Sequence, residues 1–187
     1  MNNPLSPERD RLLALLRERS VLHGDFVLAS GRRSPYYIDC RRTTMHAEGL
    51  RLIGALGLAA IRARGWDADV IGGLTLGADP VAYAVALASC GAPPAVSAFT
   101  VRKAAKAHGA GRRIEGCFEA GARVVVAEDV ITTGASALEA AHVVRAEGGT
   151  VLGVLAVVDR DEGGRQALES EGLRVHALAV VGELLAG

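Results

Sequence analysis

One stretch of the sequence decides the fold: Arg123-Val124-Val125-Val126-Ala127-Glu128-Asp129-Val130-Ile131-Thr132-Thr133-Gly134-Ala135-Ser136. It passes from an apolar run, through two adjacent acids, into a turn rich in threonine and glycine, and helical spacing follows the turn. A buried strand that leads straight into a helix is a basic unit of α/β proteins. The stretch therefore predicts a strand, a polar turn and a helix.

Other segments repeat this pattern of a strand followed by a helix. Short aliphatic runs at 70–71, 96–101, 151–158 and 175–181 are typical of parallel strands buried on both faces. Helices are expected at 47–64, 79–89, 135–147 and 164–171. The expected fold class is α/β, with a doubly wound, mainly parallel sheet flanked by helices. In such folds, ligands bind beyond the carboxyl ends of the strands.

The N-terminal part of the chain has a different pattern. Ser6-Pro7-Glu8 is typical of a helix start, because serine can cap a helix and proline is tolerated in its first turn. The segment from Gly24 to Asp39 mixes aromatic residues with serine, glycine and proline, which favours a loop and a hairpin over a core strand.

Composition and charge exclude several classes of protein. Half of the 187 residues are hydrophobic, and 21 basic residues balance 21 acidic ones, so we expect neither a nucleic-acid nor a membrane partner. Cys40, Cys90 and Cys117 lack the spacing of a zinc site or a disulfide framework, and we expect them to be small core residues. The N-terminus shows no signal peptide, which favours a cytoplasmic location.

The turn after the two acids has the chemistry of a phosphate site. A helix N-terminus presents unpaired N–H groups and a positive dipole, and Thr132, Thr133 and Ser136 add hydroxyl donors. Glu128 and Asp129 accept hydrogen bonds, so they suit sugar hydroxyls or the water shell of a magnesium ion. A phosphoribosyl group satisfies both halves. The alternative is an ordinary strand-to-helix turn with threonine and serine caps.

The only two lysines of the chain, Lys103 and Lys106, lie three positions apart in a segment of small residues. Lysine is a mobile point charge suited to a polyphosphate, Arg102 can add a bidentate contact, and His108 can donate a proton to departing pyrophosphate. The small residues between them favour a lid that excludes water. The alternative is a solvated basic loop.

Two further segments offer contacts to a carboxylate and to a flat ring. Arg160 follows the apolar run 151–158, which places its guanidinium at the ligand edge of the sheet, where it can bind a carboxylate. Tyr36 and Tyr37 offer contacts to a heterocycle. The alternatives are a surface ion pair for Arg160 and a hairpin whose tyrosines pack on the core.

Together these motifs resemble the orotate phosphoribosyltransferases, a family of type I phosphoribosyltransferases. The resemblance covers residues 22 to about 181 through the acid-and-threonine stretch, the Arg-Lys-x-x-Lys-x-His segment, the Ser-Gly-x-x-Ser-x-x-Tyr-x-Asp segment and Asp159-Arg160. It implies transfer of ribose 5-phosphate from 5-phosphoribosyl 1-diphosphate to N1 of orotate. It also implies Mg²⁺ held mainly by substrate and water, with no direct protein ligand, and a homodimer with shared active sites.

The resemblance also assigns roles to residues. It implies that Thr132, Thr133, Gly134, Ala135 and Ser136 hold the 5-phosphate, with Val130 and Ile131 also part of the sugar-diphosphate site. It also implies that Glu128 and Asp129 bind the ribose hydroxyls and that Thr132 contacts orotate. It implies that Asp129, Lys103, Lys106 and His108 act in catalysis, with Arg102 also on the diphosphate. It further implies a single domain over 1–187, in which a small N-terminal hood, within 1–45, contributes to the base site.

The sequence departs from the family at two positions. Many members have lysine where Ala29 stands and another lysine near Gly77, so neither of those lysines can be carried over. Two other functions fit parts of the pattern: a phosphoribosyltransferase for a different base, and a ligand-sensing regulator that has lost catalysis. Arg160 argues against the first, and the short segment before the first motif leaves no room for a DNA-binding module of the second.

Overall fold

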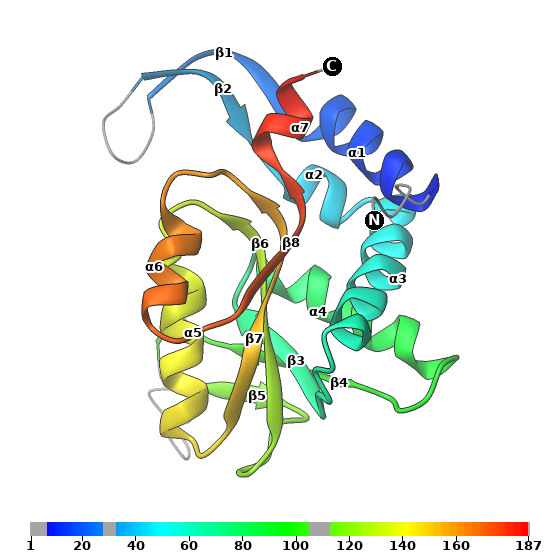
Figure 1. Ribbon diagram of the computed structural model, residues 1–187, viewed down its shortest axis with the longest axis vertical. Helices are drawn as coiled ribbons and strands as arrows, with labels where there is room; N and C mark the ends of the chain where they lie inside the picture. Colours follow the sequence, from blue (N-terminus) through cyan, green and yellow to red (C-terminus); the bar gives the residue numbers. More distant parts are fainter. Residues whose placement is uncertain (1–6, 28–32, 105–112, 187) are drawn as a thin grey trace.

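A six-stranded sheet forms the centre of the protein (Figure 1). The structure is a computed structural model that describes residues 7–27, 33–104 and 113–186. Five strands are parallel, and the short edge strand β5 runs antiparallel to β4, in the order β5-β4-β3-β6-β7-β8. The bounds are β3 Val70–Leu74, β4 Ser97–Val101, β5 Ile114–Gly116, β6 Arg123–Ile131, β7 Thr150–Asp159 and β8 Val175–Val180.

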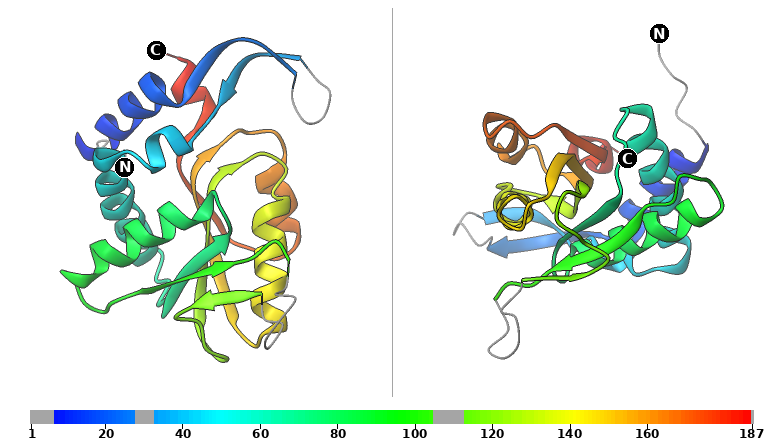
Figure 2. Two further views of the ribbon diagram at one scale, coloured as in Figure 1. Left: turned by 180° about the vertical axis from the view of Figure 1, so that it is seen from behind. Right: turned by 90° about the horizontal axis from the view of Figure 1, so that it is seen from below.

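Helices cover both faces of this sheet. The helices α3 (Ala47–Ala63) and α4 (Ala78–Cys90) pack on one face, and α5 (Ala135–Ala146) and α6 (Gly164–Ser170) pack on the other (Figure 2). Successive residues of β6 alternate between the two layers of core: Val124 and Val126 pack with α5, whereas Val125 and Ala127 pack with α3 and α4. A strand buried on both faces needs a continuous apolar run. The helices on both faces of the sheet confirm the doubly wound α/β prediction.

A small layer lies above the carboxyl ends of the central strands. It contains α1 (Pro7–Arg19), the antiparallel pair β1 (Val21–Val27) and β2 (Arg33–Ile38), and α2 (Arg41–Thr44). We call residues 7–44 the hood. The last helix, α7 (Val181–Leu185), packs against α1 (Figure 1). Arg9 of α1 donates two hydrogen bonds, of 2.7 and 2.8 Å, to the Glu183 carboxylate of α7.

Most elements lie where the sequence predicts them, with two differences. Strand β6 continues through the two acids to Ile131, because it remains paired with β7 as far as Asp159. The short elements α2, β5 and α7 have no periodic signal of their own. Cys40 is buried as predicted, but the prediction is wrong for Cys90 and Cys117, which are exposed free thiols. Within the described ranges, no helix has both the length and the apolar character needed to span a membrane.

Candidate active site

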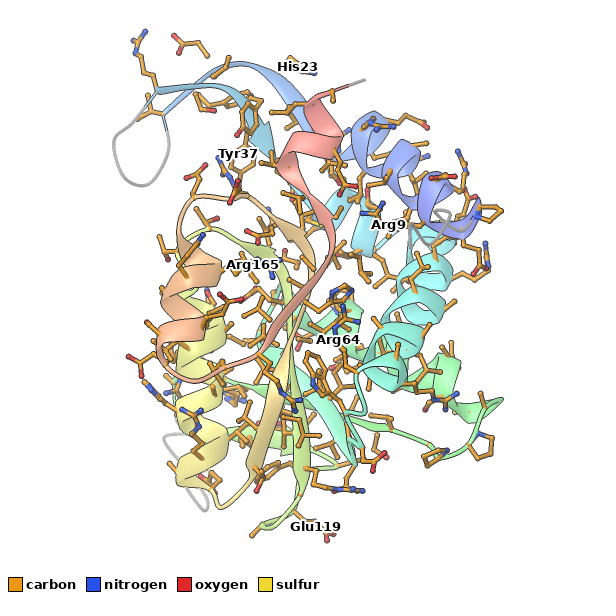
Figure 3. All side chains as sticks on the ribbon, viewed as in Figure 1. Arg9, His23, Tyr37, Arg64, Glu119 and Arg165 are labelled. Atoms are coloured by element: carbon orange, nitrogen blue, oxygen red, sulfur yellow. The ribbon has the colours of Figure 1, made fainter. Side chains whose placement is uncertain are left out.

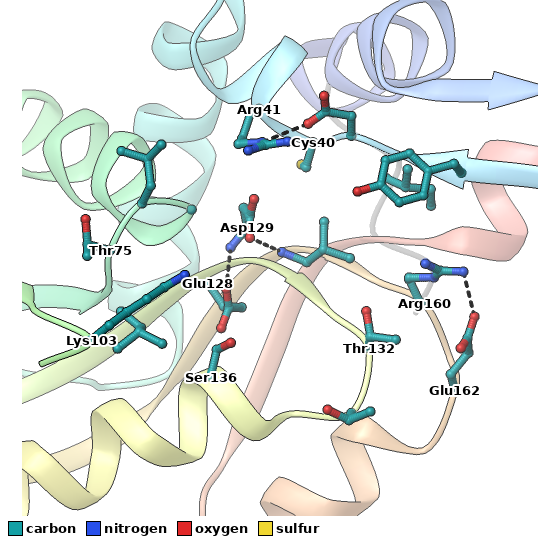
Figure 4. A pocket seen from close by; sticks show the side chains of 18 of the residues that line it. Cys40, Arg41, Thr75, Lys103, Glu128, Asp129, Thr132, Ser136, Arg160 and Glu162 are labelled. Carbon is teal, nitrogen blue, oxygen red and sulfur yellow. Dashed lines mark hydrogen bonds and ion pairs between the residues drawn. The ribbon is translucent and has the colours of Figure 1, made fainter. Parts of the chain in front are cut away.

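A pocket of about 680 Å³ lies between the hood and the carboxyl edge of the sheet (Figure 4). It opens where β3 and β6 separate. These strands pair only over Val70 to Gly72 and Val124 to Val126; beyond that, Leu74 pairs with β4 while β6 continues beside β7. Because the chain winds outward in opposite directions from β3 and β6, this is the switch point at which α/β sheets bind ligands.

The two acids line the pocket from β6. Glu128 is buried, and the pKa of its carboxyl is raised well above its usual range, first by burial and then by the charge of Asp129. Asp129 is held by a 2.9 Å hydrogen bond from the Val130 amide to its Oδ1. An acid pair beside a cavity accepts hydrogen bonds from a diol and stabilises positive charge that develops nearby.

The turn after β6 forms a smaller recess of about 80 Å³, lined by Thr132, Thr133, Gly134, Ala135 and Ser136 as well as Glu128 and Val130. Gly134 has φ 80°, and a β-carbon there would lie 2.8 Å from the carbonyl oxygen of Gly164, so glycine is required. The recess is at the N-terminus of α5, where unpaired N–H groups favour an anion. Ile131 does not line either pocket, because its side chain is in the core.

The predicted lysine segment follows β4. Lys103 lines the pocket. Arg102 does not line it; its Nη1 donates a 2.9 Å hydrogen bond to Glu115 of β5. The predicted roles of Lys106 and His108 fall outside the described residues.

Arg160 lines the end of the pocket opposite Lys103 (Figure 4) and is 6% exposed. Its Nη2 lies 2.8 Å from Glu162 Oε1, and its guanidinium lies 5.7 Å from the centre of the Tyr36 ring. Its Nε is buried and has no hydrogen-bond partner within the described ranges. Such a donor suits a planar anionic ligand, because an unmet buried donor is costly.

The two tyrosines have different positions. Tyr37 projects from β2 into the pocket (Figure 3), and its ring packs against that of Phe26 in a tilted arrangement, with ring centres 5.7 Å apart. Tyr36 does not line the pocket but supports Arg160. Tyr37 can therefore contact a ligand in the pocket directly, whereas Tyr36 can act only through Arg160.

Sequence reasoning missed several pocket residues, namely Val27, Ile38, Asp39, Cys40, Arg41 and Glu162. Asp39 ends the Tyr-x-Asp pattern, and this pattern could have indicated that the residues next to it also line the pocket. Nothing in the local sequence shows that Arg41 faces Asp129, because the hood brings it there.

An acid pair in front of a threonine-rich phosphate recess, at the switch point of a doubly wound sheet, defines a type I phosphoribosyltransferase. No family model matches the chain. The orotate phosphoribosyltransferase of Mycobacterium tuberculosis is 50% identical over 95% of this chain and 97% of its own length. This chain belongs to the orotate phosphoribosyltransferases, and it is a pentosyltransferase.

Solved structures agree with this assignment. The M. tuberculosis enzyme in complex with Fe(III) dicitrate has a TM-score of 0.86 and 49% identity, covering 96% of this chain and 99% of its own. The same enzyme in complex with 5-phospho-alpha-D-ribosyl 1-diphosphate has a TM-score of 0.80 and 42% identity, covering 96% of this chain and 92% of its own.

Proposed function

We propose that the pocket joins orotate to the ribose 5-phosphate of 5-phosphoribosyl 1-diphosphate, giving orotidine 5′-phosphate and pyrophosphate. The observation that carries this proposal is Arg160: a buried guanidinium with an unmet donor at the same sheet edge as the phosphate recess. Orotate has a carboxylate that this group can bind, and a neutral base has none. We also treat the whole chain, 1–187, as one domain.

The proposed substrate position follows from the chemistry of the walls. The 5-phosphate lies in the recess from Thr132 to Ser136, and the ribose hydroxyls face Glu128 and Asp129. The diphosphate then extends toward Lys103 and the loop Thr75 to Gly77. Orotate lies between Tyr37, Thr132 and Arg160. N1 of orotate attacks C1′ as the bond to the diphosphate breaks, and the acids stabilise the positive charge that develops on the ribosyl group.

Magnesium fits this arrangement as an ion held mainly by substrate. The described residues contain no cluster of three or more metal-binding side chains, whereas Glu128 and Asp129 could bind water in the shell of such an ion. Bound Mg²⁺ would neutralise charge on the diphosphate.

We also propose a homodimer with shared active sites. On α4, Tyr83 and Leu87 lie one turn apart and are 53% and 76% exposed, with Leu76 exposed just before the helix. An exposed apolar stripe of this kind is a candidate interface. Arg102 and Lys103 lead out of β4, so the segment that carries Lys106 and His108 begins close to the pocket. We also propose that the protein is cytoplasmic and has neither a nucleic-acid nor a membrane partner.

One assay tests the function. Loss of orotate absorbance is followed with 5-phosphoribosyl 1-diphosphate and Mg²⁺, and parallel reactions contain adenine, hypoxanthine or uracil. We expect turnover with orotate alone. Turnover of another base in preference to orotate would contradict the assignment of Arg160, and no turnover with any base would favour a ligand-sensing protein.

A further inference from the structure

A second arginine lines the pocket on the hood side. Arg41 is the first residue of α2 and lies across the cavity from the recess (Figure 4). Among the described residues, the basic side chains that line this cavity are Arg41, Lys103 and Arg160. Arg160 serves the base end. Only Arg41 approaches from the hood.

The backbone around Arg41 is fixed by hydrogen bonds. The Asp39 amide donates to the Ser20 carbonyl oxygen at 3.0 Å, and the Thr44 amide donates to the Cys40 carbonyl oxygen at 2.8 Å. The Cys40 side chain is buried beneath this turn. A cation on a rigid turn is held in place before a ligand arrives, which reduces the entropy lost on binding.

The guanidinium of Arg41 is only partly used by the protein. Its Nε donates to Asp39 Oδ1 at 2.9 Å, and its side chain remains 49% exposed. Within the described ranges, its two terminal nitrogens have no protein partner. These nitrogens are free to bind a ligand in the pocket.

The charge of Asp129 acts on Arg41. The pKa of Arg41 is raised first by its hydrogen bond and attraction to Asp39, and also by the charge of Asp129. In the proposed function, Asp129 contacts the ribose hydroxyls, and the group attached at C1′ extends toward the loop Thr75 to Gly77. Arg41 and this loop line the same pocket.

We propose that Arg41 binds the diphosphate of the sugar substrate from within the same subunit. This inference rests on the proposed function. The described wall of the pocket carries four acids, Asp39, Glu128, Asp129 and Glu162, against three cations. A polyphosphate therefore needs each available cation, and a planar guanidinium with two free nitrogens can bind two phosphate oxygens.

The test uses Arg41→Gln, with Arg42→Gln as the matched control. Arg42 is the next residue of the same helix, is exposed, and does not line the pocket. We expect Arg41→Gln to raise the KM for 5-phosphoribosyl 1-diphosphate about 10- to 100-fold, the effect of losing a hydrogen bond to a charged group. The KM for orotate should change less than about threefold, and Arg42→Gln should match the wild type in both constants.

A binding experiment separates this role from a structural one. Pyrophosphate with Mg²⁺ is titrated calorimetrically into wild type, Arg41→Gln, Arg41→Lys and Asp39→Asn. We expect weaker binding in Arg41→Gln, partial recovery in Arg41→Lys, and no weakening in Asp39→Asn, which loses the ion pair but keeps the cation. Equal weakening in Arg41→Gln and Asp39→Asn would assign Arg41 to holding the hood and overturn the proposal.

The remaining outcomes separate the inference from the function. An active wild type whose Arg41→Gln variant binds pyrophosphate normally would overturn the inference and leave the function intact. A larger rise in the KM for orotate than for the sugar would also overturn it. A wild type that turns over no base, yet binds pyrophosphate through Arg41, would overturn the function alone.

Discussion

The carboxylate of Asp129 lies directly against the α-carbon of Gly77. A β-carbon built on Gly77 would be 2.6 Å from Asp129 Oδ1 and 2.7 Å from its Cγ. The loop before α4 and the acid of β6 therefore fit together only when residue 77 has no side chain.

We predict that Gly77→Ala lowers activity far more than stability. Gly77 has φ −64° and ψ −42°, which alanine adopts readily, so the backbone is not strained. The new methyl group pushes the Asp129 carboxylate out of position, and a shift of about 1 Å in a catalytic group can cost about 100-fold in rate. Turnover and thermal unfolding measured together check this. Equal turnover in variant and wild type would show that the Asp129 position is unimportant.

We predict that Arg160→Gln raises the KM for orotate about 10- to 100-fold and changes that for the sugar diphosphate much less. Arg165→Gln is the control, because Arg165 pairs with Asp159 at 2.8 Å nearby but does not line the pocket. Steady-state kinetics with each substrate varied in turn provide the measurement. A similar rise in both constants would remove Arg160 from the base end.

We predict that Glu128→Gln stabilises the protein at neutral pH while lowering turnover. The folded-state pKa of Glu128 is raised above its unfolded value near 4.5, so its carboxylate binds a proton more tightly in the folded protein than in the unfolded one. Wild type therefore loses stability as pH rises from about 4.5 through the folded pKa, and the amide does not. Urea unfolding of both proteins at pH 4 and pH 7 should show a gain for the variant only at pH 7. A gain independent of pH would contradict this.

We predict that Asp79→Ala weakens binding of the sugar diphosphate. Asp79 accepts hydrogen bonds from Thr75 Oγ1 at 2.7 Å and from Thr100 Oγ1 at 2.8 Å, so it joins the pocket loop to the end of β4. Losing both costs about 1 to 3 kcal/mol of stability and loosens the loop beneath the diphosphate. Asp79→Asn should show a smaller loss than Asp79→Ala, since the carbonyl oxygen of asparagine still accepts a hydrogen bond. Kinetics and unfolding of both variants decide this; an unchanged KM in Asp79→Ala would contradict it.

We predict that Lys106→Ala and Arg160→Ala proteins, each nearly inactive alone, recover measurable activity when they are unfolded together and refolded as a mixture. If Lys106 serves the partner subunit's site, a mixed dimer has one site with both defects and one with neither. Random pairing makes about half of the dimers mixed, so about a quarter of wild-type activity is the ceiling. Activity is assayed beside a demonstration that mixed dimers are present. No gain in such a mixture would place Lys106 in its own subunit's site.

The strand-and-helix framework could be predicted because each central element carries its own signal. Val124 to Ala127 is apolar on both faces, and Gly134 stands where a positive φ is needed. The phosphate recess could be predicted because its residues are consecutive in the sequence. Arg160 could be placed because it directly follows a strand. These features depend on neighbouring residues, and so the sequence shows them directly.

The remaining features depend on contacts between distant segments. The position of Arg41 opposite β6 requires the hood to fold over the sheet, and Arg102 turns from the pocket because the three-residue strand β5 brings Glu115 beside it. The exposure of Cys90 and Cys117 likewise depends on which surfaces are covered. No local spacing reports such distances.

The pairing of Arg9 with Glu183 joins the first helix to the last. Although the hood is encoded at the start of the chain, part of its packing surface is α7, at 181–185. During synthesis on the ribosome, the hood therefore lacks this support until residues 181–185 have emerged. The wall of the pocket that carries Arg41 thus gains this support only after β6, α5 and the recess between them have been synthesised.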